Sequence, residues 1–293
     1  MTIGKAYRGV ATFVCLFSCW QSILANEMHF GVQASRNAIQ TMKEWDGMQK
    51  YLETETGIKV NLVPLNPAQT LGAIRTGQID MMLANPVLAF TLQVRDGYKP
   101  ILTQLSQAGP YFAGVIFVRK DSDLHEVADL KGRKVMAFKF KSAAAAYVFQ
   151  VKHLLDKGID AHKEFSDFRE ARTQDDIVFA VQAGVMDAGF IKAGLLETMS
   201  KEGKVKFDDF RVLDKVEGKY LYAHTTKLYP DWTLMVNPKY DAQNIVKIKA
   251  ALVKLNASHP ACKAANIHGF TDPLSLDEMG IALKALKLPP YDR

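Results

Sequence analysis

The stretch IDMMLANPVLAF, residues 79–90, decides how this chain must be organised. Its apolar run stops at Asn85-Pro86 and resumes at once, so a polar residue and a proline split one buried segment. Proline fits the first position of a helix, because its missing N–H would have no partner there. The stretch therefore predicts a buried strand that ends at Ala84 and a helix that begins at Pro86. Asn85 stands between them, either as the helix cap or as a ligand contact.

A strand followed by a helix recurs along the whole chain. Strand-like runs at 28–33, 58–65, 79–84 and 99–105 alternate with helical periods, and the alternation starts again after Asp121. This pattern is typical of mostly parallel sheets with helices on their faces. Its restart predicts an α/β fold with two lobes.

An internal repeat supports the two lobes. The segment AIRTGQIDMMLAN (73–85) matches AVQAGVMDAGFIK (180–192) in one alanine, one glycine, one aspartate and its apolar positions. Each copy predicts a helix, a glycine stop, a turn with aspartate and a buried strand with a polar residue at its end. The repeat makes Lys192 the counterpart of Asn85. Because ligands of open α/β sheets bind beyond the carboxyl ends of the strands, where helix N-termini favour anions, two such ends predict a cleft.

The overall composition favours a globular protein that binds a small molecule rather than nucleic acid. The 293 residues are 48% hydrophobic and 23% charged, which suffices for a sizeable core. The net charge of +6 is spread through the chain, without the dense Lys/Arg run typical of nucleic-acid binding. A modest positive charge instead favours an anionic ligand.

The first 25 residues read as a secretory signal peptide. Lys5 and Arg8 precede a short apolar segment, and a small residue follows at Ala25. LFSC at 16–19 fits a lipoprotein box poorly, so we do not expect lipid anchoring at Cys19. Only Cys262 remains after cleavage, which excludes an intrachain disulfide in the mature protein. These features predict a periplasmic protein that is held together by its core.

The sequence lacks the common motifs for catalysis, cofactors and metals. It has no GxGxxG, GxxxxGK[ST], HExxH or GxSxG pattern. His259, Cys262 and His268 are close in sequence, but their spacing matches no standard zinc site. We therefore expect no cofactor and no metal, and an exported enzyme of unfamiliar type stays open as an alternative.

The order of segments resembles that of type II periplasmic solute-binding proteins of the phosphonate-binding branch. DLKGRKVMAF (129–138) and the glycine–aspartate strand at 77–84 carry this resemblance. The chain also resembles the periplasmic sensor domain of tetrathionate-type histidine kinases, through four main segments. These are LANP (83–86), DAGFIKAGLLE (187–197), AHTTKLYPDW (223–232) and GFTDPLSLDEMGIALKALKLPPY (269–291). In one departure, Lys192 stands where the sensor pattern has arginine.

The resemblance implies a two-lobed fold with a ligand cleft between the lobes. We expect a signal peptide at 1–25, one lobe from 27–118 plus 222–293, and a second lobe at 119–221. Since no transmembrane or kinase segment follows in this sequence, we expect a free periplasmic monomer that presents its ligand to a membrane partner. That partner is an ABC permease or, alternatively, a sensor kinase, and the ligand is a phosphonate, phosphite, sulfur oxyanion or small carboxylate.

Ten residues are candidates for contact with an anion in this cleft. Each has a structural alternative: an exposed loop arginine, a plain helix cap, a surface lysine, hinge packing, or an aromatic core contact. The lysines and arginine supply charge, the hydroxyls, amide and imidazole supply donors, and the tyrosine supplies an aromatic wall. The candidates are Ser35, Arg36, Asn85, Tyr111, Lys141, Ser142, Lys192, His224, Thr225 and Thr226.

Overall fold

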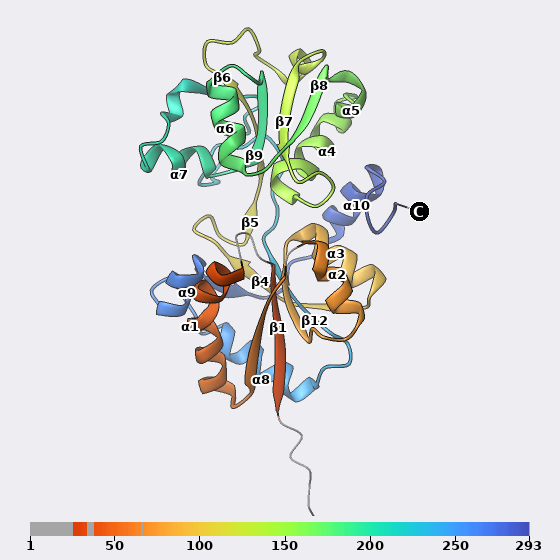
Figure 1. Cartoon of the computed structure of the whole chain (residues 1–293), viewed down its shortest axis with the longest axis vertical. Coiled ribbons are helices and arrows are strands. Elements are labelled where there is room, and N and C mark those ends of the chain that lie inside the picture. Colours follow the sequence, from red (N-terminus) through yellow and green to blue (C-terminus); the bar gives the residue numbers. More distant parts are fainter. Residues whose placement is uncertain (1–25, 34–37, 66, 293) are drawn as a thin grey trace, which may run out of the picture.

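The computed structural model describes residues 26–33, 38–65 and 67–292, whose strands form two main sheets. The six-stranded sheet has the order β13-β4-β12-β3-β1-β2, and the five-stranded sheet has the order β10-β6-β9-β7-β8. Figure 1 shows the two sheets end to end, each with helices on its faces. The predicted α/β fold with two lobes is confirmed.

The first lobe is built from both ends of the chain. Its elements are β1 (Glu27–Gln33), α1 (Ala38–Thr56), β2 (Lys59–Leu65), α2 (Pro67–Arg75), β3 (Met81–Ala84), α3 (Pro86–Arg95), β4 (Lys99–Leu105), β12 (Thr233–Val236), α8 (Ala242–Leu252), α9 (Pro260–Ala265), β13 (Gly269–Thr271) and α10 (Asp277–Ala285). β1 pairs in parallel with β2 and β3, whereas β12 runs antiparallel to β3 and β4.

The second lobe is one continuous segment. Its elements are β6 (Gly114–Arg119), the 3₁₀ turn Val127–Leu130, β7 (Lys134–Phe138), a π-helix (Ala144–Val148), α4 (Phe149–Asp156), α5 (Ala161–Glu164), β8 (Asp167–Ala171), α6 (Gln174–Gln182), β9 (Ala188–Lys192), α7 (Leu195–Lys201), the 3₁₀ turn Phe207–Asp209 and β10 (Phe210–Val212). Here β7 is parallel to β8 and β9, and β6 is antiparallel to β9.

A short antiparallel ribbon joins the two lobes. Its strands are β5 (Tyr111–Phe112) and β11 (Tyr229–Pro230), which connect the lobes in opposite directions. The expected lobe boundary at residue 118 falls inside β6, which belongs to the second sheet, so the first crossing occurs before Gly114. Residues 221–224, on the return crossing, form bends and coil.

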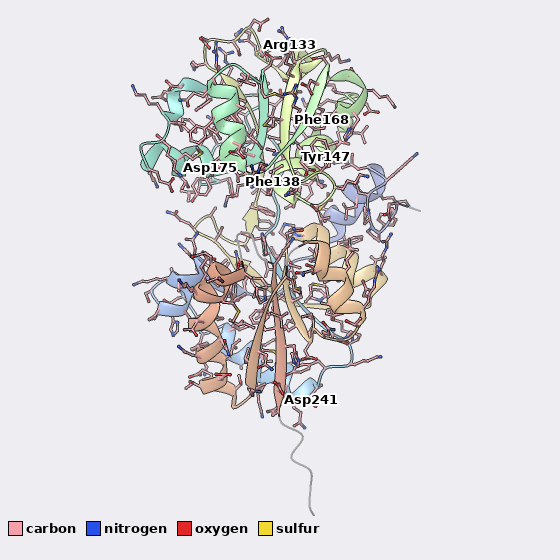
Figure 2. The ribbon with its side chains drawn as sticks, in the orientation of Figure 1. Arg133, Phe138, Tyr147, Phe168, Asp175 and Asp241 are labelled. Atoms are coloured by element: carbon pink, nitrogen blue, oxygen red, sulfur yellow. The ribbon has the colours of Figure 1, made fainter. Side chains whose placement is uncertain are left out.

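The strand ends of the two lobes face each other. Arg133, just before β7, lies at the far end of the second lobe, whereas Phe138, the last residue of β7, lies at the end nearest the first lobe (Figure 2). Asp241, beyond β12, lies at the opposite extreme of the first lobe. Since β12 is antiparallel to β3, the carboxyl end of β3 points toward the second lobe.

The sequence repeat is also a structural repeat. Asp80, before β3, accepts a hydrogen bond through Oδ2 from the backbone N–H of His29 in β1 at 2.8 Å. Asp187, before β9, accepts the equivalent bond from the N–H of Lys134 in β7, also at 2.8 Å. The glycines of the two copies have φ of 73° and 70°, a left-handed turn that favours glycine. Each aspartate thus ties the strand that follows it to a neighbouring parallel strand, β3 to β1 and β9 to β7.

We expect Asp80→Ala and Asp187→Ala each to lower the free energy of unfolding by about 1.5–3 kcal/mol, the typical value of a hydrogen bond to a charged group. Chemical unfolding at neutral pH checks this. Asp123→Ala is the matched control, because its carboxylate is mostly exposed in a surface ion pair with Arg133 and should contribute at most about 1 kcal/mol. Equal losses in all three variants would contradict the structural role of the repeat.

Candidate functional site

Six strands, each followed by a helix, end toward the space where the lobes meet. In the first lobe β1, β2 and β3 are followed by α1, α2 and α3, and in the second lobe β7, β8 and β9 are followed by the π-helix, α6 and α7. The first N–H groups of a helix have no partner within it, and the helix dipole makes that end positive. Two facing sets of such ends therefore favour an anion between them.

Asn85 connects three of the segments at this junction. Its Oδ1 accepts a hydrogen bond from the N–H of Leu88 at 3.1 Å, so the predicted cap of α3 is confirmed. Its Nδ2 donates to Oε1 of Gln33, at the end of β1, at 3.1 Å and to the carbonyl oxygen of Ser142, in the second lobe, at 3.3 Å. The amide is buried. Asn85 therefore touches both lobes, and its contact with a ligand stays a prediction.

Lys192 occupies the equivalent strand end in the second lobe. It pairs with Gly114 across β9 and β6, and its backbone N–H donates to Oε1 of Gln174 at 2.8 Å. Its side chain is exposed. Burial raises the pKa of Asp231, which lies two residues before β12 of the first lobe, and the positive charge of Lys192 partly opposes this rise. Lys192 thus lies at the junction of the lobes, as the repeat predicts.

Asp231 is a buried acid that the candidate set omitted. Its side chain is only 5% exposed, and its Oδ1 accepts a hydrogen bond from the N–H of Trp232 at 2.7 Å. Burial raises its pKa to about 6, against the opposing effects of the Trp232 N–H, Lys192 and the Ser106 hydroxyl. The only signal in the sequence was its place in the segment AHTTKLYPDW. A carboxylate beside Lys192 offsets part of the positive charge that an anion would meet.

Thr225 and Thr226 bind the crossing segment to the second sheet, and His224 is buried next to them in sequence. The Thr226 hydroxyl accepts from the N–H of Gly114 at 2.9 Å, and the Thr225 hydroxyl accepts from Ile116 at 2.9 Å. All three side chains are buried, and Nδ1 of His224 lies 3.1 Å from a backbone carbonyl oxygen. As donors, the Thr225 and Thr226 hydroxyls bond to the carbonyl oxygens of Leu213 at 2.8 Å and Lys227 at 3.0 Å. Contact of these three residues with an anion stays a prediction.

The loop after β7 also differs from its prediction. Ser142 does not cap the alanine-rich helix, because its hydroxyl donates to the carbonyl of Lys139 at 3.4 Å and the helix begins after Ala143 as a π-helix. Lys141 has a left-handed backbone, with φ of 68°, and its side chain lines a separate cavity beside α4 and α5. Of this pair, only the Ser142 carbonyl reaches the junction, through Asn85.

The remaining candidates have mixed outcomes. Tyr111 lies in the ribbon strand β5 with its side chain 38% exposed, a position compatible with an aromatic wall. Its carbonyl accepts a hydrogen bond from the Tyr220 hydroxyl at 3.3 Å. Ser35 and Arg36 lie outside the described residues. Tyr111 therefore stays a prediction for the site.

Metal binding finds no support in the described part of the chain. Residues 26–33, 38–65 and 67–292 contain no group of three or more His, Cys, Asp or Glu side chains that could hold an ion. His259 instead caps α9 through Nδ1, which accepts from the N–H of Ala261 at 3.2 Å, and Cys262 is buried. Over the same residues, every helix is too short or too polar to span a bilayer.

The fold and its facing strand ends define a two-lobed α/β solute-binding protein. The chain belongs to the periplasmic substrate-binding proteins of phosphonate ABC transporters, whose family model matches residues 30–277. The family of binding proteins inferred from the sequence is confirmed, and the family places the protein in the periplasm.

A sensor kinase and two solved structures are similar to this chain. The tetrathionate sensor histidine kinase TtrS of Salmonella typhimurium is 24% identical over 308 aligned residues, which cover 99% of this chain and 49% of the kinase. This chain therefore spans about half the length of that curated relative.

The solved structures establish the fold alone, because both are less than 20% identical to this chain. XAC2383 from Xanthomonas citri, bound to ATP, has a TM-score of 0.72 and 19% identity, and the match covers 89% of this chain and 98% of that one. PhnD1 from Prochlorococcus marinus, in complex with methylphosphonate, has a TM-score of 0.68 and 15% identity, with 90% and 99% covered.

Proposed function

We propose that this protein captures a small oxyanion or anionic organic molecule between its lobes and presents it to an ABC permease. The single observation that carries the proposal is that two equivalent strand ends lie where the lobes join. Asn85 lies at the strand end of the first lobe, and Lys192 lies at that of the second lobe, near Asp231 of the first. An amide donor, an ammonium and several helix N-termini together suit an anion. The family supports a small ligand and a membrane partner.

Closure of the lobes around the ligand is the proposed mechanism. The two-stranded ribbon β5–β11 is short, and the threonines beside it fix it to the second sheet, so rotation can concentrate there. A ligand favours the closed arrangement only through contacts that are better in that arrangement. In this proposal the protein acts as a monomer and catalyses no reaction.

A sensory role is the second candidate. It is favoured by the similarity to TtrS, which extends over 99% of this chain. In that role the ligand-bound protein would act on a membrane histidine kinase instead of a permease. Neighbouring genes for a permease and an ATPase would support uptake, whereas genes for a kinase and a response regulator would support sensing.

A thermal-shift screen tests the proposed function. Methylphosphonate, phosphite, tetrathionate and a small carboxylate are each added to the mature protein, with sodium chloride of equal ionic strength as control. A ligand at 100 times its Kd should stabilise the fold by about 2.7 kcal/mol, which raises the Tm by several degrees. Turnover of a stabilising anion would instead indicate an enzyme, and no shift with any anion would contradict the proposal.

A further inference from the structure

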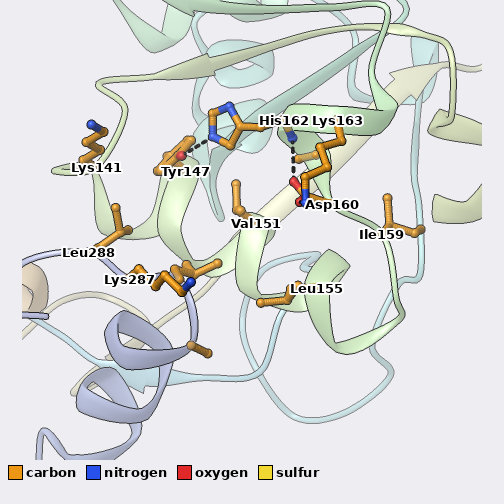
Figure 3. A pocket seen from close by; sticks show the side chains of 13 residues that line it. Lys141, Tyr147, Val151, Leu155, Ile159, Asp160, His162, Lys163, Lys287 and Leu288 are labelled. Carbon is orange, nitrogen blue, oxygen red and sulfur yellow. Dashed lines mark hydrogen bonds and ion pairs between the residues drawn. The ribbon is translucent and has the colours of Figure 1, made fainter. Parts of the chain in front are cut away.

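A cavity that is open to solvent lies beside α4 and α5 of the second lobe. It measures about 550 Å³ and is also bordered by residues 285–288, which include the end of α10 and the segment after it (Figure 3). Asn85, Lys192 and Asp231 do not line it. The volume falls within the range of roughly 300–1,000 Å³ found for small-molecule sites.

The polar lining of this cavity is predominantly cationic. Lys141, Lys163 and Lys287 line it, against one acid, Asp160, whose carboxylate is already paired with Lys163 at 2.7 Å. Among the described residues, neither Lys141 nor Lys287 forms an ion pair with an acid. Both have a left-handed backbone, with φ of 68° and 52°, which is uncommon for lysine. Two unpaired ammonium groups from different parts of the chain thus border one cavity.

The remaining lining is apolar and aromatic. Val151 and Leu155 on α4 face Leu288 from the C-terminal segment, and Figure 3 shows these side chains around one hollow. The Tyr147 hydroxyl lies 2.6 Å from Nε2 of His162, which fixes an aromatic edge to the cavity. This surface would bury an apolar body, while the lysines would pair with a negative group.

We propose that this cavity is a second ligand site, which takes a compact amphipathic anion: an aromatic or branched apolar body that carries one carboxylate or sulfonate. The inference rests on the cavity and its lining, and it does not depend on the ligand of the interlobe site. One wall of the cavity belongs to the second lobe. The other wall is formed by residues 285–288 at the end of α10, and α10 packs against α3 of the first lobe as well as against α4. An occupant would therefore contact segments of both lobes, so its affinity should depend on their arrangement.

Fluorescence titration with 1-anilinonaphthalene-8-sulfonate, an aromatic sulfonate, tests this site on the full mature protein at pH 7. We expect one saturable site, and we expect Lys287→Glu to raise its Kd at least tenfold. Leu155→Gln, at a side chain that is 37% exposed, should raise the Kd several-fold without disturbing the fold. Lys247→Glu makes the same charge change on α8, in the first lobe, and should leave the Kd within twofold.

The dye titration tests the cavity beside α4 independently of the proposed anion site between the lobes. Unchanged binding in Lys287→Glu, or an equal loss in Lys247→Glu, would overturn the second site, because the dye would then respond elsewhere or to overall charge. Lys192→Ala should leave dye binding unchanged, whereas loss of dye binding in that variant would place the dye in the interlobe site and also overturn the proposal. The anion screen gives its own result in either case.

Discussion

Replacing Lys192 by alanine is expected to weaken anion binding between the lobes at least tenfold. Lys192 ends β9 within electrostatic range of the first lobe's Asp231, and its side chain is exposed, so its ammonium is available to a ligand. A hydrogen bond between charged groups contributes about 1.5–3 kcal/mol, and 1.4 kcal/mol corresponds to a factor of ten. Lys192→Glu should abolish binding, because it adds repulsion to the loss of the ion pair.

Isothermal titration with the anion that gives the largest thermal shift measures this effect. Lys134→Ala is the matched control, since Lys134 is an exposed lysine at the amino end of β7, on the far side of the same lobe. Its Kd should stay within twofold of the wild type. If Lys192→Ala binds like this control, the cationic interlobe site is wrong.

Asn85→Asp tests the interlobe anion site from the side of the first lobe. Aspartate keeps the acceptor that caps α3, so the helix start should survive. The substitution removes the Nδ2 donor, which contacts Gln33 and Ser142, and introduces a negative charge. Anion affinity should therefore fall while the far-UV circular dichroism stays unchanged, and unaltered affinity would remove Asn85 from the proposed site.

The sequence could predict the strand ends because local chemistry determines them. The proline after Asn85 marks a helix start, and the glycine and aspartate before β3 and before β9 mark a turn, whatever the rest of the chain does. The repeat then located Lys192 opposite Asn85. Both positions lie at the junction of the lobes, so periodicity and turn residues were sufficient to predict where these two residues lie.

Contacts between residues far apart in sequence could not be predicted in this way. The Thr225 and Thr226 hydroxyls accept hydrogen bonds from N–H groups of β6, more than a hundred residues earlier, and donate to the carbonyl oxygens of Leu213 and Lys227. The same holds for Asp231, whose burial depends on how the ribbon and the Ser106 loop pack around it. No local pattern records these packing effects.

Asp231→Asn is expected to stabilise the folded protein by about 2 kcal/mol at pH 7. The carboxyl is buried, and its pKa is raised from 3.8 to about 6, so its ionised form is costly in the folded state. A shift of this size corresponds to about 3 kcal/mol, at 1.36 kcal/mol for each pH unit. Asparagine stays neutral and keeps an oxygen for the Trp232 N–H, but its new NH₂ group near Lys192 should reduce the gain.

The sign of this stability change follows from how Asp231 ionises in the folded and unfolded chains. Below about pH 3.8 the carboxyl is protonated in both folded and unfolded chains, so Asp231 carries no ionisation cost. Between pH 3.8 and about 6 the folded chain binds more protons than the unfolded chain, so wild-type stability falls as the pH rises. The stability difference between Asp231→Asn and the wild type should therefore increase from pH 3.8 to about pH 6 and stay constant at higher pH.

Tm measured from pH 4 to pH 8 follows that difference, with Asp123→Asn as the control at a mostly exposed carboxylate. A difference that is the same at pH 4 and pH 7 would show that ionisation of Asp231 is not its source. The same variant should bind the interlobe anion several-fold more tightly, because it removes a negative charge beside Lys192. Greater stability with weaker binding would instead mean that the carboxylate positions Lys192 for the ligand, and that its burial is retained for this purpose despite the cost in stability.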